Sequence, residues 1–215
     1  MKLPSRVFSR RTRSAAETKP EGPQRHRSLA VEYTLERVRA GEGKVEVLDL
    51  GSACGETLAY YSDLPCKIYF ADFYSDLKSR PPDPEDGLDG FLEACRRCLP
   101  FGPESRFDLV HSWDLFNYLE LEQIGGLSRF LAPHLAPEAP LVSLIWIRQR
   151  IPAQPCRFAI LDDHTVEYRP SSPAETTAPR YKEPDLLRAM GSYRARKSFL
   201  LRHGVQEYVF DLTGG

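Results

Sequence analysis

Residues 45–57 constrain the fold of this chain more than any other stretch. Residues 45–50 form a short, mostly apolar run, and its length and β-branched content are typical of a strand buried on both faces. Small residues follow at 51–55, and helical spacing resumes at Glu56. A buried strand, a tight turn and a helix in this order predict a parallel sheet covered by helices.

Strand and helix patterns alternate through the first two thirds of the chain. The predicted strands cover residues 45–50, 67–71, 107–111 and 141–147. The first predicted helix begins after Ser28 and ends at Gly41 or Gly43. Further helices are predicted at residues 56–61, 88–99 and 120–135, the last with a weak point at Gly125 and Gly126. Strands at 198–201 and 205–210, joined at 202–204, predict a hairpin. We therefore expect an α/β fold: a doubly wound, mostly parallel sheet with a C-terminal antiparallel hairpin.

The segment between the last parallel strand and the hairpin follows a different pattern. Residues 148–180 contain five prolines and suggest a strand pair at 158–161 and 166–168. We interpret this segment as a variable insertion within one domain covering residues 28–215. The longest strongly apolar stretch of that domain is seven residues, 141–147, and a membrane-spanning helix needs roughly 20. No membrane span is therefore predicted.

The first 27 residues differ from the rest in charge. They carry eight basic and two acidic side chains, about +6, whereas the remaining residues carry 21 basic and 28 acidic side chains, about −7. With three prolines and little apolar periodicity, residues 1–27 are predicted to be a disordered basic tail. A mitochondrial presequence, attraction to nucleic acid or a membrane surface, and a purely solvating tail all remain open.

The cysteine pattern favours a reducing compartment and no metal. Five cysteines are an odd number in a chain too long to need disulfides, so we expect a cytoplasmic protein. Cys95 and Cys98 form the one C-x-x-C pair, but a tetrahedral zinc site needs two further ligands, and no second pair exists in the sequence. The pair is therefore predicted to be two small apolar side chains one turn apart on a helix.

The glycine-rich turn suits a ligand without phosphate. A dinucleotide fingerprint would need glycine near Gly51, Ala53 and Glu56. Glu56 instead places a negative charge where a diphosphate would meet the helix N-terminus. Small residues at Gly51, Ala53 and Gly55, with an acid tolerated beside them, suit a ligand that has a positive centre.

Residues 47–55 resemble the first motif of the class I S-adenosylmethionine-dependent methyltransferases. That motif runs apolar-apolar-D-x-G-x-G-x-G, and Ala53 stands here in place of the middle glycine. The resemblance continues at Asp72, where the family has an acid that binds the ribose hydroxyls at the end of the second strand. Two hydroxyl donors to one carboxylate form a good bidentate bond. The resemblance implies S-adenosyl-L-methionine as the cofactor.

Later segments resemble the family in order, with one departure. Residues 99–101 and 106–110 resemble the approach to its fourth strand, which implies that Trp113 and Asp114 face the sulfonium and methyl group. The family usually carries an adenine-binding acid four residues before the Leu-Pro-Phe turn, and that position here is Cys95. Glu93 serves only if the loop is spaced differently. The third strand is therefore expected to be short or absent.

Two sets of candidate residues follow from the resemblance. The expected cofactor-binding residues are Asp49, Gly51, Ala53, Gly55, Asp72 and Trp113. The candidate catalytic residues are His111, as a base, and Asp114; Asn117 and Tyr118 are candidate substrate contacts. Structural alternatives stay open: His111 as a hydrogen-bonded core histidine, Trp113 as core, Asp49 as an acceptor for loop amides, Asp72 as a turn cap, and Glu56 as a residue favoured by the helix dipole.

The predicted function is S-adenosylmethionine-dependent methyl transfer to a small or medium polar molecule. Residues 148–180 are expected to build the acceptor site. Methyl transfer needs positioning more than a base, since orientation alone can lower a barrier by roughly 7 to 11 kcal/mol. One alternative is a catalytically inactive relative that binds a partner, as Ala53 and Cys95 suggest. The other is a nucleic-acid-associated protein that uses residues 1–27.

Overall fold

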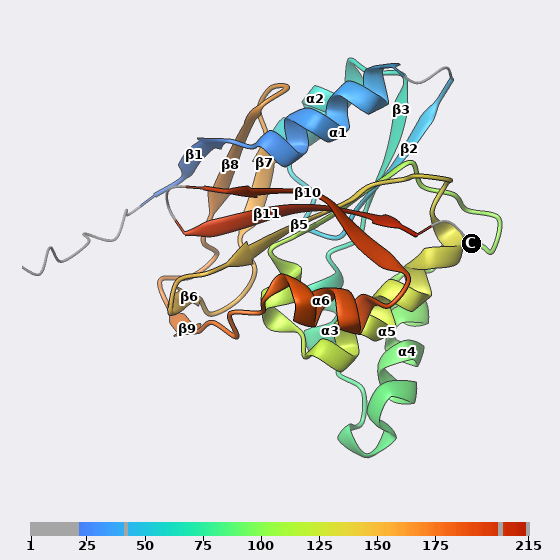
Figure 1. Ribbon diagram of the computed structural model, residues 1–215, viewed down its shortest axis with the longest axis vertical. Coiled ribbons are helices and arrows are strands. Elements are labelled where there is room, and N and C mark those ends of the chain that lie inside the picture. The colour runs from blue at the N-terminus through green and yellow to red at the C-terminus, as the bar shows by residue number, and fades with distance from the viewer. Residues whose placement is uncertain (1–21, 41–42, 202–203, 214–215) are drawn as a thin grey trace, which may run out of the picture.

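Six strands form the central sheet of the computed structural model, which describes residues 22–40, 43–201 and 204–213. They lie in the order β10-β11-β5-β4-β2-β3 (Figure 1). Their bounds are β2 (Val45–Asp49), β3 (Cys66–Phe70), β4 (Leu109–Trp113), β5 (Leu141–Trp146), β10 (Tyr193–Leu200) and β11 (Val205–Leu212). Strands β2 to β5 pair in parallel, whereas β11 runs antiparallel to both β5 and β10. The predicted fold class, a mostly parallel sheet ending in an antiparallel hairpin, is confirmed.

Helices cover both faces of this sheet (Figure 1). Helices α1 (Leu29–Ala40) and α2 (Gly55–Ser62) pack on one face, where Val31, Leu35 and Tyr61 join a core with Val47. The other face carries α3 (Phe73–Ser79), α4 (Gly87–Cys98), α5 (Leu121–Leu131) and α6 (Glu183–Met190). Two separate apolar cores explain why β4 and β5 are buried along their whole length.

Local signals set several helix boundaries. The Ser28 hydroxyl accepts a hydrogen bond from the Val31 amide at 3.2 Å and caps α1 as predicted. Glu120 and Gln123 form a capping box at the start of α5, which runs without a break through both of its glycines. Short 3-10 helices lie at Pro84–Asp86, Leu115–Tyr118 and Ala132–His134.

No strand lies between β3 and β4. Residues 71–108, all of which the structure describes, form α3, a 3-10 turn and α4, so β3 is an edge strand. The position expected for the family's adenine-binding acid, Cys95, is buried on α4, and burial raises the pKa of its thiol to about 12. Cys98 is buried one turn later, as expected for two small apolar side chains on a helix. Glu93 is exposed and pairs with Arg96 at 3.0 Å.

The segment from 148 to 180 builds two small sheets beside the central one. Strands β7 (Arg157–Ile160) and β8 (Thr165–Arg169) form the predicted pair, and β6 (Arg150–Pro152) pairs with β9 (Glu175–Thr177). Strand β1 (Gln24–Arg27) adds to β8. This corrects the predicted tail, which extended to residue 27: β1 is ordered because its backbone pairs with β8 and Arg25 binds Glu167 at 2.7 Å. Residues 1–21 of that tail lie outside the described residues.

The structure also differs from the predicted elements between β3 and β4. Helix α3 was not predicted, and β4 begins at Leu109, two residues later than expected. The Asp108 amide donates to the Glu46 carbonyl, but the Glu46 amide is accepted by Asp108 Oδ2 and not by a backbone carbonyl, each at 2.8 Å, so the regular backbone ladder with β2 starts after Asp108. The predicted turn at 202–204 lies partly outside the described residues. In the described part of the chain, no helix is long and apolar enough to cross a membrane, and no group of three or more potential metal ligands occurs.

Candidate functional site

A small cavity of about 200 Å³ lies where the carboxyl ends of β2, β3 and β4 meet. This edge is where open α/β sheets bind their ligands. Its lining includes Gly51 and Ser52 after β2, Asp72 after β3, and Trp113 and Asp114 at the end of β4. Residues 154–156 and Ser171, from the segment that follows β5, also line it.

Asp49 fixes the turn after β2. Its Oδ1 accepts hydrogen bonds from the Gly51 amide at 2.8 Å and from the Trp113 indole Nε1 at 2.7 Å. Burial raises the pKa of Asp49 to about 7, although both hydrogen bonds favour the ionised form. Asp49 therefore ties the turn to the end of β4 and does not line the cavity.

The two glycines of the turn have different surroundings. A Cβ atom on Gly51 would lie 3.0 Å from Trp113 Cδ1 and 3.1 Å from Asp49 Oδ1, so a larger residue there would have to push the indole or the Asp49 carboxyl aside by a few tenths of an ångström. A Cβ atom on Gly55 would meet nothing within 4 Å. Gly55 and Ala53 line a separate space of about 110 Å³ beside Phe158. The structure thus brings only Gly51 of the three small residues to the cavity at the strand ends.

Asp72 links the first two strands of the site. Its Oδ2 accepts a hydrogen bond from the Ser52 hydroxyl at 2.6 Å, and its Oδ1 accepts one from the Ser75 amide at 3.4 Å. The carboxylate therefore caps α3 and also lines the cavity. Ser52 was not among the predicted site residues, and its place inside the glycine-rich turn was the signal that could have identified it.

Trp113 is both a core residue and a wall of the cavity. Its ring is stacked between His111, at 4.6 Å between centroids, and Phe158, at 4.9 Å. Its backbone φ of 49° lies in the left-handed region, which a bulky residue rarely adopts and which only surrounding contacts can hold. The stack and the bond to Asp49 supply those contacts.

The structure does not bring His111 to the cavity. The imidazole is fully buried behind Trp113, and its Nε2 lies 2.9 Å from the Tyr61 hydroxyl. Burial lowers the pKa of His111 to about 3, so the ring is neutral at physiological pH.

Asp114 is the least satisfied acid at the site. Its Oδ2 accepts hydrogen bonds from the Cys156 amide at 3.2 Å and the Trp146 indole at 3.3 Å. Its Oδ1 is buried without a hydrogen-bond partner in the described part of the chain. Burial raises the pKa of Asp114 to about 7. A buried acceptor left unpaired costs about 1 to 3 kcal/mol, more when charged, so this wall of the cavity favours a donor or a cation.

Neither candidate substrate contact lines the cavity. Asn117 is fully used within the fold: its amide donates to the Asp114 and Leu144 carbonyls and accepts from the Trp146 amide. The Tyr118 hydroxyl donates to the Pro152 carbonyl at 3.1 Å. Glu56 lies on the first turn of α2 and pairs with Arg169 at 3.0 Å.

Comparison with known proteins gives only a general likeness of chain path. No family model matches the chain, and no curated protein matches it. A methyltransferase from Clostridium acetobutylicum described as S-adenosylmethionine-dependent is 13% identical, with 86% of this chain and 91% of that chain covered and a TM-score of 0.49. The 1,6-didemethyltoxoflavin-N1-methyltransferase from Burkholderia thailandensis, solved with bound 1,6-didemethyltoxoflavin and S-adenosylhomocysteine, is 16% identical, with 85% of this chain and 76% of that chain covered and a TM-score of 0.46.

A third solved structure is similar at the same level. The glycopeptide N-methyltransferase MtfA in complex with S-adenosyl-L-methionine is 15% identical, with 85% of this chain and 94% of that chain covered and a TM-score of 0.44. What the site of this chain can do therefore depends on its own residues.

Proposed function

We propose that this chain binds S-adenosyl-L-methionine at the cavity between β2, β3 and β4 and transfers its methyl group to a small or medium polar molecule. One observation carries the proposal. The buried Oδ1 of Asp114 has no partner among the described residues, and it belongs to the same cavity as Gly51 and Asp72. A carboxylate in that state suits a cationic ligand and opposes a phosphate.

The donors and acceptors around the cavity fit this cofactor. Asp72, at the tip of β3, would hold the two ribose hydroxyls, with Ser52 as its neighbour. Asp114, at the end of β4, would face the positively charged methionine end, and a cation there would favour its ionised form. Gly51 lets the backbone of the turn approach the ligand.

The cavity is smaller than the ligand requires. Sites for molecules of drug size occupy roughly 300 to 1,000 Å³, against about 200 Å³ here. Binding therefore displaces residues 154–156 and Ser171. The bonds that this movement breaks are those of Cys156, whose amide donates to Asp114 at 3.2 Å and whose buried thiol also contacts Asp114; the bond from Ser171 to the Pro155 carbonyl lies within the segment that moves.

The chain contributes positioning and exclusion of water. The cofactor, when bound, supplies a methyl group on a positively charged sulfur. The segment from 154 to 171 covers the carboxyl ends of the strands, and Asp114 and Asp72 orient the two ends of the ligand. No base is proposed, since His111 lies away from the cavity and orientation alone accounts for roughly 7 to 11 kcal/mol.

The binding step is tested by calorimetry with S-adenosylhomocysteine. At 100 times its dissociation constant, a ligand adds about 2.7 kcal/mol of stability. That addition raises the Tm of a chain of this length by roughly 5 to 11 °C. Neither heat of binding nor any rise in Tm at millimolar ligand would contradict the proposal.

Asp72→Asn locates the site. Asparagine keeps the α3 cap but loses the charged acceptor, so S-adenosylhomocysteine should bind about 10 to 100 times more weakly. Asp76→Asn is the matched control, since Asp76 is an exposed acid one turn later on α3. Equal affinity in the two variants would remove Asp72 from the site.

Transfer itself distinguishes an enzyme from an inactive binder. The inactive alternative was motivated by Ala53, in place of the middle glycine of the motif, and by Cys95, which is buried on α4 where the family has an acid. Binding of the cofactor without transfer of a labelled methyl group to any molecule in an acceptor panel would favour that alternative. Binding of RNA or DNA that the full chain loses on neutralising the basic residues of 1–27 would favour the nucleic-acid alternative.

A further inference from the structure

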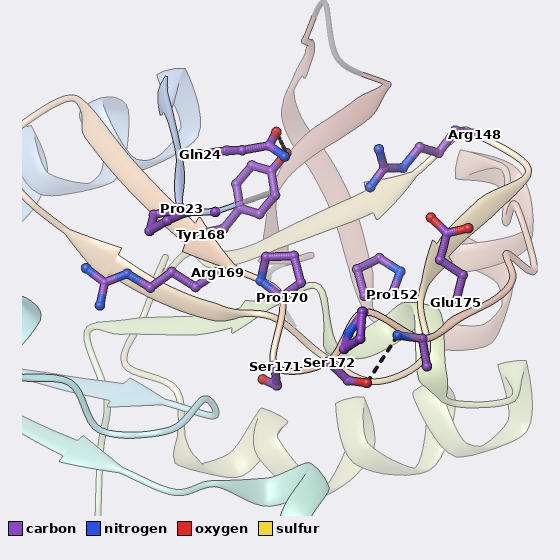
Figure 2. A pocket seen from close by; sticks show the side chains of 13 residues that line it. Pro23, Gln24, Arg148, Pro152, Tyr168, Arg169, Pro170, Ser171, Ser172 and Glu175 are labelled. Atoms are coloured by element: carbon purple, nitrogen blue, oxygen red, sulfur yellow. Dashed lines mark hydrogen bonds between the residues drawn. The ribbon is translucent and has the colours of Figure 1, made fainter. Parts of the chain in front are cut away.

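Figure 2 shows a second cavity, of about 520 Å³. It shares the lining residue Ser171 with the proposed cofactor cavity. Its walls come from the end of β8, from residues 170–175, from Pro152 on β6, and from Gly22, Pro23 and the first residue of β1, Gln24. Four of the lining residues are prolines, Pro23, Pro152, Pro170 and Pro173, and Tyr168 adds an aromatic ring. The walls are therefore mostly apolar and conformationally stiff.

Arg148 supplies the charge in this cavity. Figure 2 shows its side chain reaching into the space from the end of β5, opposite Tyr168 and Pro170. The guanidinium carbon lies over the Trp146 ring, 4.1 Å from its centre, as in a cation–π contact. Its Nε is buried without a hydrogen-bond partner, and no carboxylate of the described residues lies within 4.0 Å of its nitrogens.

The other charged residues of the lining are engaged elsewhere. Arg169 binds Glu167 and also Glu56, at 3.0 Å. Glu175 pairs with Arg150, with 3.6 Å between Arg150 Nε and Glu175 Oε2. Arg148 is half-buried and has no carboxylate partner among the described residues, so its guanidinium leaves a positive charge at a mostly apolar cavity that an anionic ligand can pair with.

We propose that this cavity holds the methyl acceptor, that the acceptor is a small organic acid with an apolar body, and that Arg148 binds its carboxylate. The assignment rests on the proposed methyltransferase function. A guanidinium matches a carboxylate through two parallel hydrogen bonds, which fixes orientation as well as charge. The proline and tyrosine walls suit the apolar body, because little polar surface is left there to satisfy.

The two cavities share one wall. Ser171 lines both of them, and its hydroxyl binds the Pro155 carbonyl at 3.3 Å. Pro152 lines the acceptor cavity, and residues 154–156 line the cofactor cavity. The segment that must move to admit the cofactor is thus the segment that separates it from the acceptor, so one displacement both enlarges the first site and joins it to the second.

The test uses matched acids and amides as probes. The full chain is titrated by NMR with indole-3-acetate and benzoate, and with indole-3-acetamide and benzamide. We expect the acids to bind at least about ten times more tightly than the amides. Arg148→Gln should weaken binding of the acids about 10- to 100-fold and leave the amides unchanged, and Arg148→Lys should fall between, since lysine keeps the charge without the planar fork.

Controls separate this inference from the proposed function. Arg188→Gln, on the exposed face of α6, is the matched loss of one arginine and should bind the acids as the unaltered chain does. S-adenosylhomocysteine binding is measured on the same samples. If S-adenosylhomocysteine binds and the acids do not, the acceptor assignment fails and the proposed function stands. The same holds if the acids bind Arg148→Gln as tightly as they bind the unaltered chain.

Two outcomes remain. If the acids bind through Arg148 but S-adenosylhomocysteine does not bind, the cavity is an acid site, and both the acceptor role and the methyltransferase proposal fail. If both bind, with the acids dependent on Arg148, the assignment is supported, and an indole or benzoate signal that strengthens when S-adenosylhomocysteine is added would further support the shared wall.

Discussion

The two buried aspartates at the strand ends, Asp49 and Asp114, differ in their hydrogen-bond partners. Burial raises the pKa of both Asp49 and Asp114 to about 7. Asp49 receives the Gly51 amide and the Trp113 indole, which is enough to explain it as a structural acceptor. Asp114 keeps one buried oxygen without a partner in the described part of the chain, so only Asp114 is set to receive something from outside the fold.

The Asp114 carboxyl should make stability fall as pH rises. Its pKa is about 7 in the folded chain and near 3.8 when unfolded, so between about pH 4 and 7 the folded state holds the extra proton. The contribution of this carboxyl to the free energy of unfolding is therefore fully present below about pH 4 and is lost progressively as the pH rises to about 7. A shift of about three units corresponds to about 4 kcal/mol as an upper figure.

Asp114→Asn removes this titration and keeps a similar shape. Urea unfolding from pH 4.5 to 8 should find the variant increasingly more stable than the unaltered chain, with the difference greatest above pH 7 and small near pH 4.5. Parallel stability curves across this range would show that Asp114 is not a desolvated acid.

The sequence predicted the site residues that follow a strand. It did not predict which individual residues of the segment after β5 cover the strand ends. The apolar pattern of a strand shows where the strand ends, and the residues just after that point are thereby placed at the edge of the sheet. This is how Asp72, Trp113 and Asp114 were identified. Residues 154–156 and Arg148 gave no such signal, since their place depends on contacts with segments distant in the chain, such as Cys156 with Asp114. The burial of His111 behind Trp113 is likewise a product of packing.

Among the elements, α5 shows how a predicted weak point becomes a contact. Gly125 and Gly126 were predicted to be a weak point of the helix, and α5 runs through both without a break. A Cβ atom on Gly125 would lie 2.5 Å from the Ala189 carbonyl oxygen of α6, so glycine there permits the close approach of the two helices. A Cβ atom on Gly126 would meet Leu88 Cδ1 at 2.9 Å, and that side-chain end can move.

Alanine at these two neighbours should therefore have unequal effects. Alanine is favoured over glycine in a helix by about 1 kcal/mol. Gly125→Ala meets backbone and should still be destabilising, by about 1 to 3 kcal/mol, whereas Gly126→Ala should be near neutral. Urea unfolding measures both, each variant serving as the control of the other. Equal effects would mean that α5 and α6 are not held at this distance by Gly125.

Elements were predicted where apolar periodicity defines them. Strands β2, β3 and β5 and helices α1, α2 and α4 fall within two residues of expectation. Strand β1 was not predicted because Gln24–Arg27 contains no apolar side chain. Its pairing with β8 depends on residues distant in the sequence, such as Glu167. Helix α3 begins at the cap that Asp72 forms; the sequence left Asp72 open as a ligand contact or a turn cap, and no helix was predicted after it.

At the scale of the whole molecule, the β1-β8-β7 sheet is joined to the central sheet rather than attached beside it. Thr57 on α2 accepts the Ile160 amide of β7 at 3.0 Å, and Cys54 donates to the Phe158 carbonyl at 3.3 Å. The core on this face is shared, since Trp113 stacks on Phe158 and Trp146 contacts Tyr168. If residues 28–215 form one domain, as predicted, the two sheets should therefore unfold cooperatively.

Unfolding of the two sheets should be a single transition. Both tryptophans contact the small sheet, so their fluorescence reports on it, while far-UV circular dichroism reports on all the helices. Thr57→Val leaves the Ile160 amide buried and unpaired, which costs about 1 to 3 kcal/mol, and it should lower both urea midpoints together. Thr34→Val is the control, because the Thr34 hydroxyl binds only carbonyls of its own helix and its loss strands no donor. If Thr57→Val moved the fluorescence midpoint and left the dichroism unchanged, the small sheet would unfold by itself, and the lining that it lends to both cavities would open without loss of the central fold.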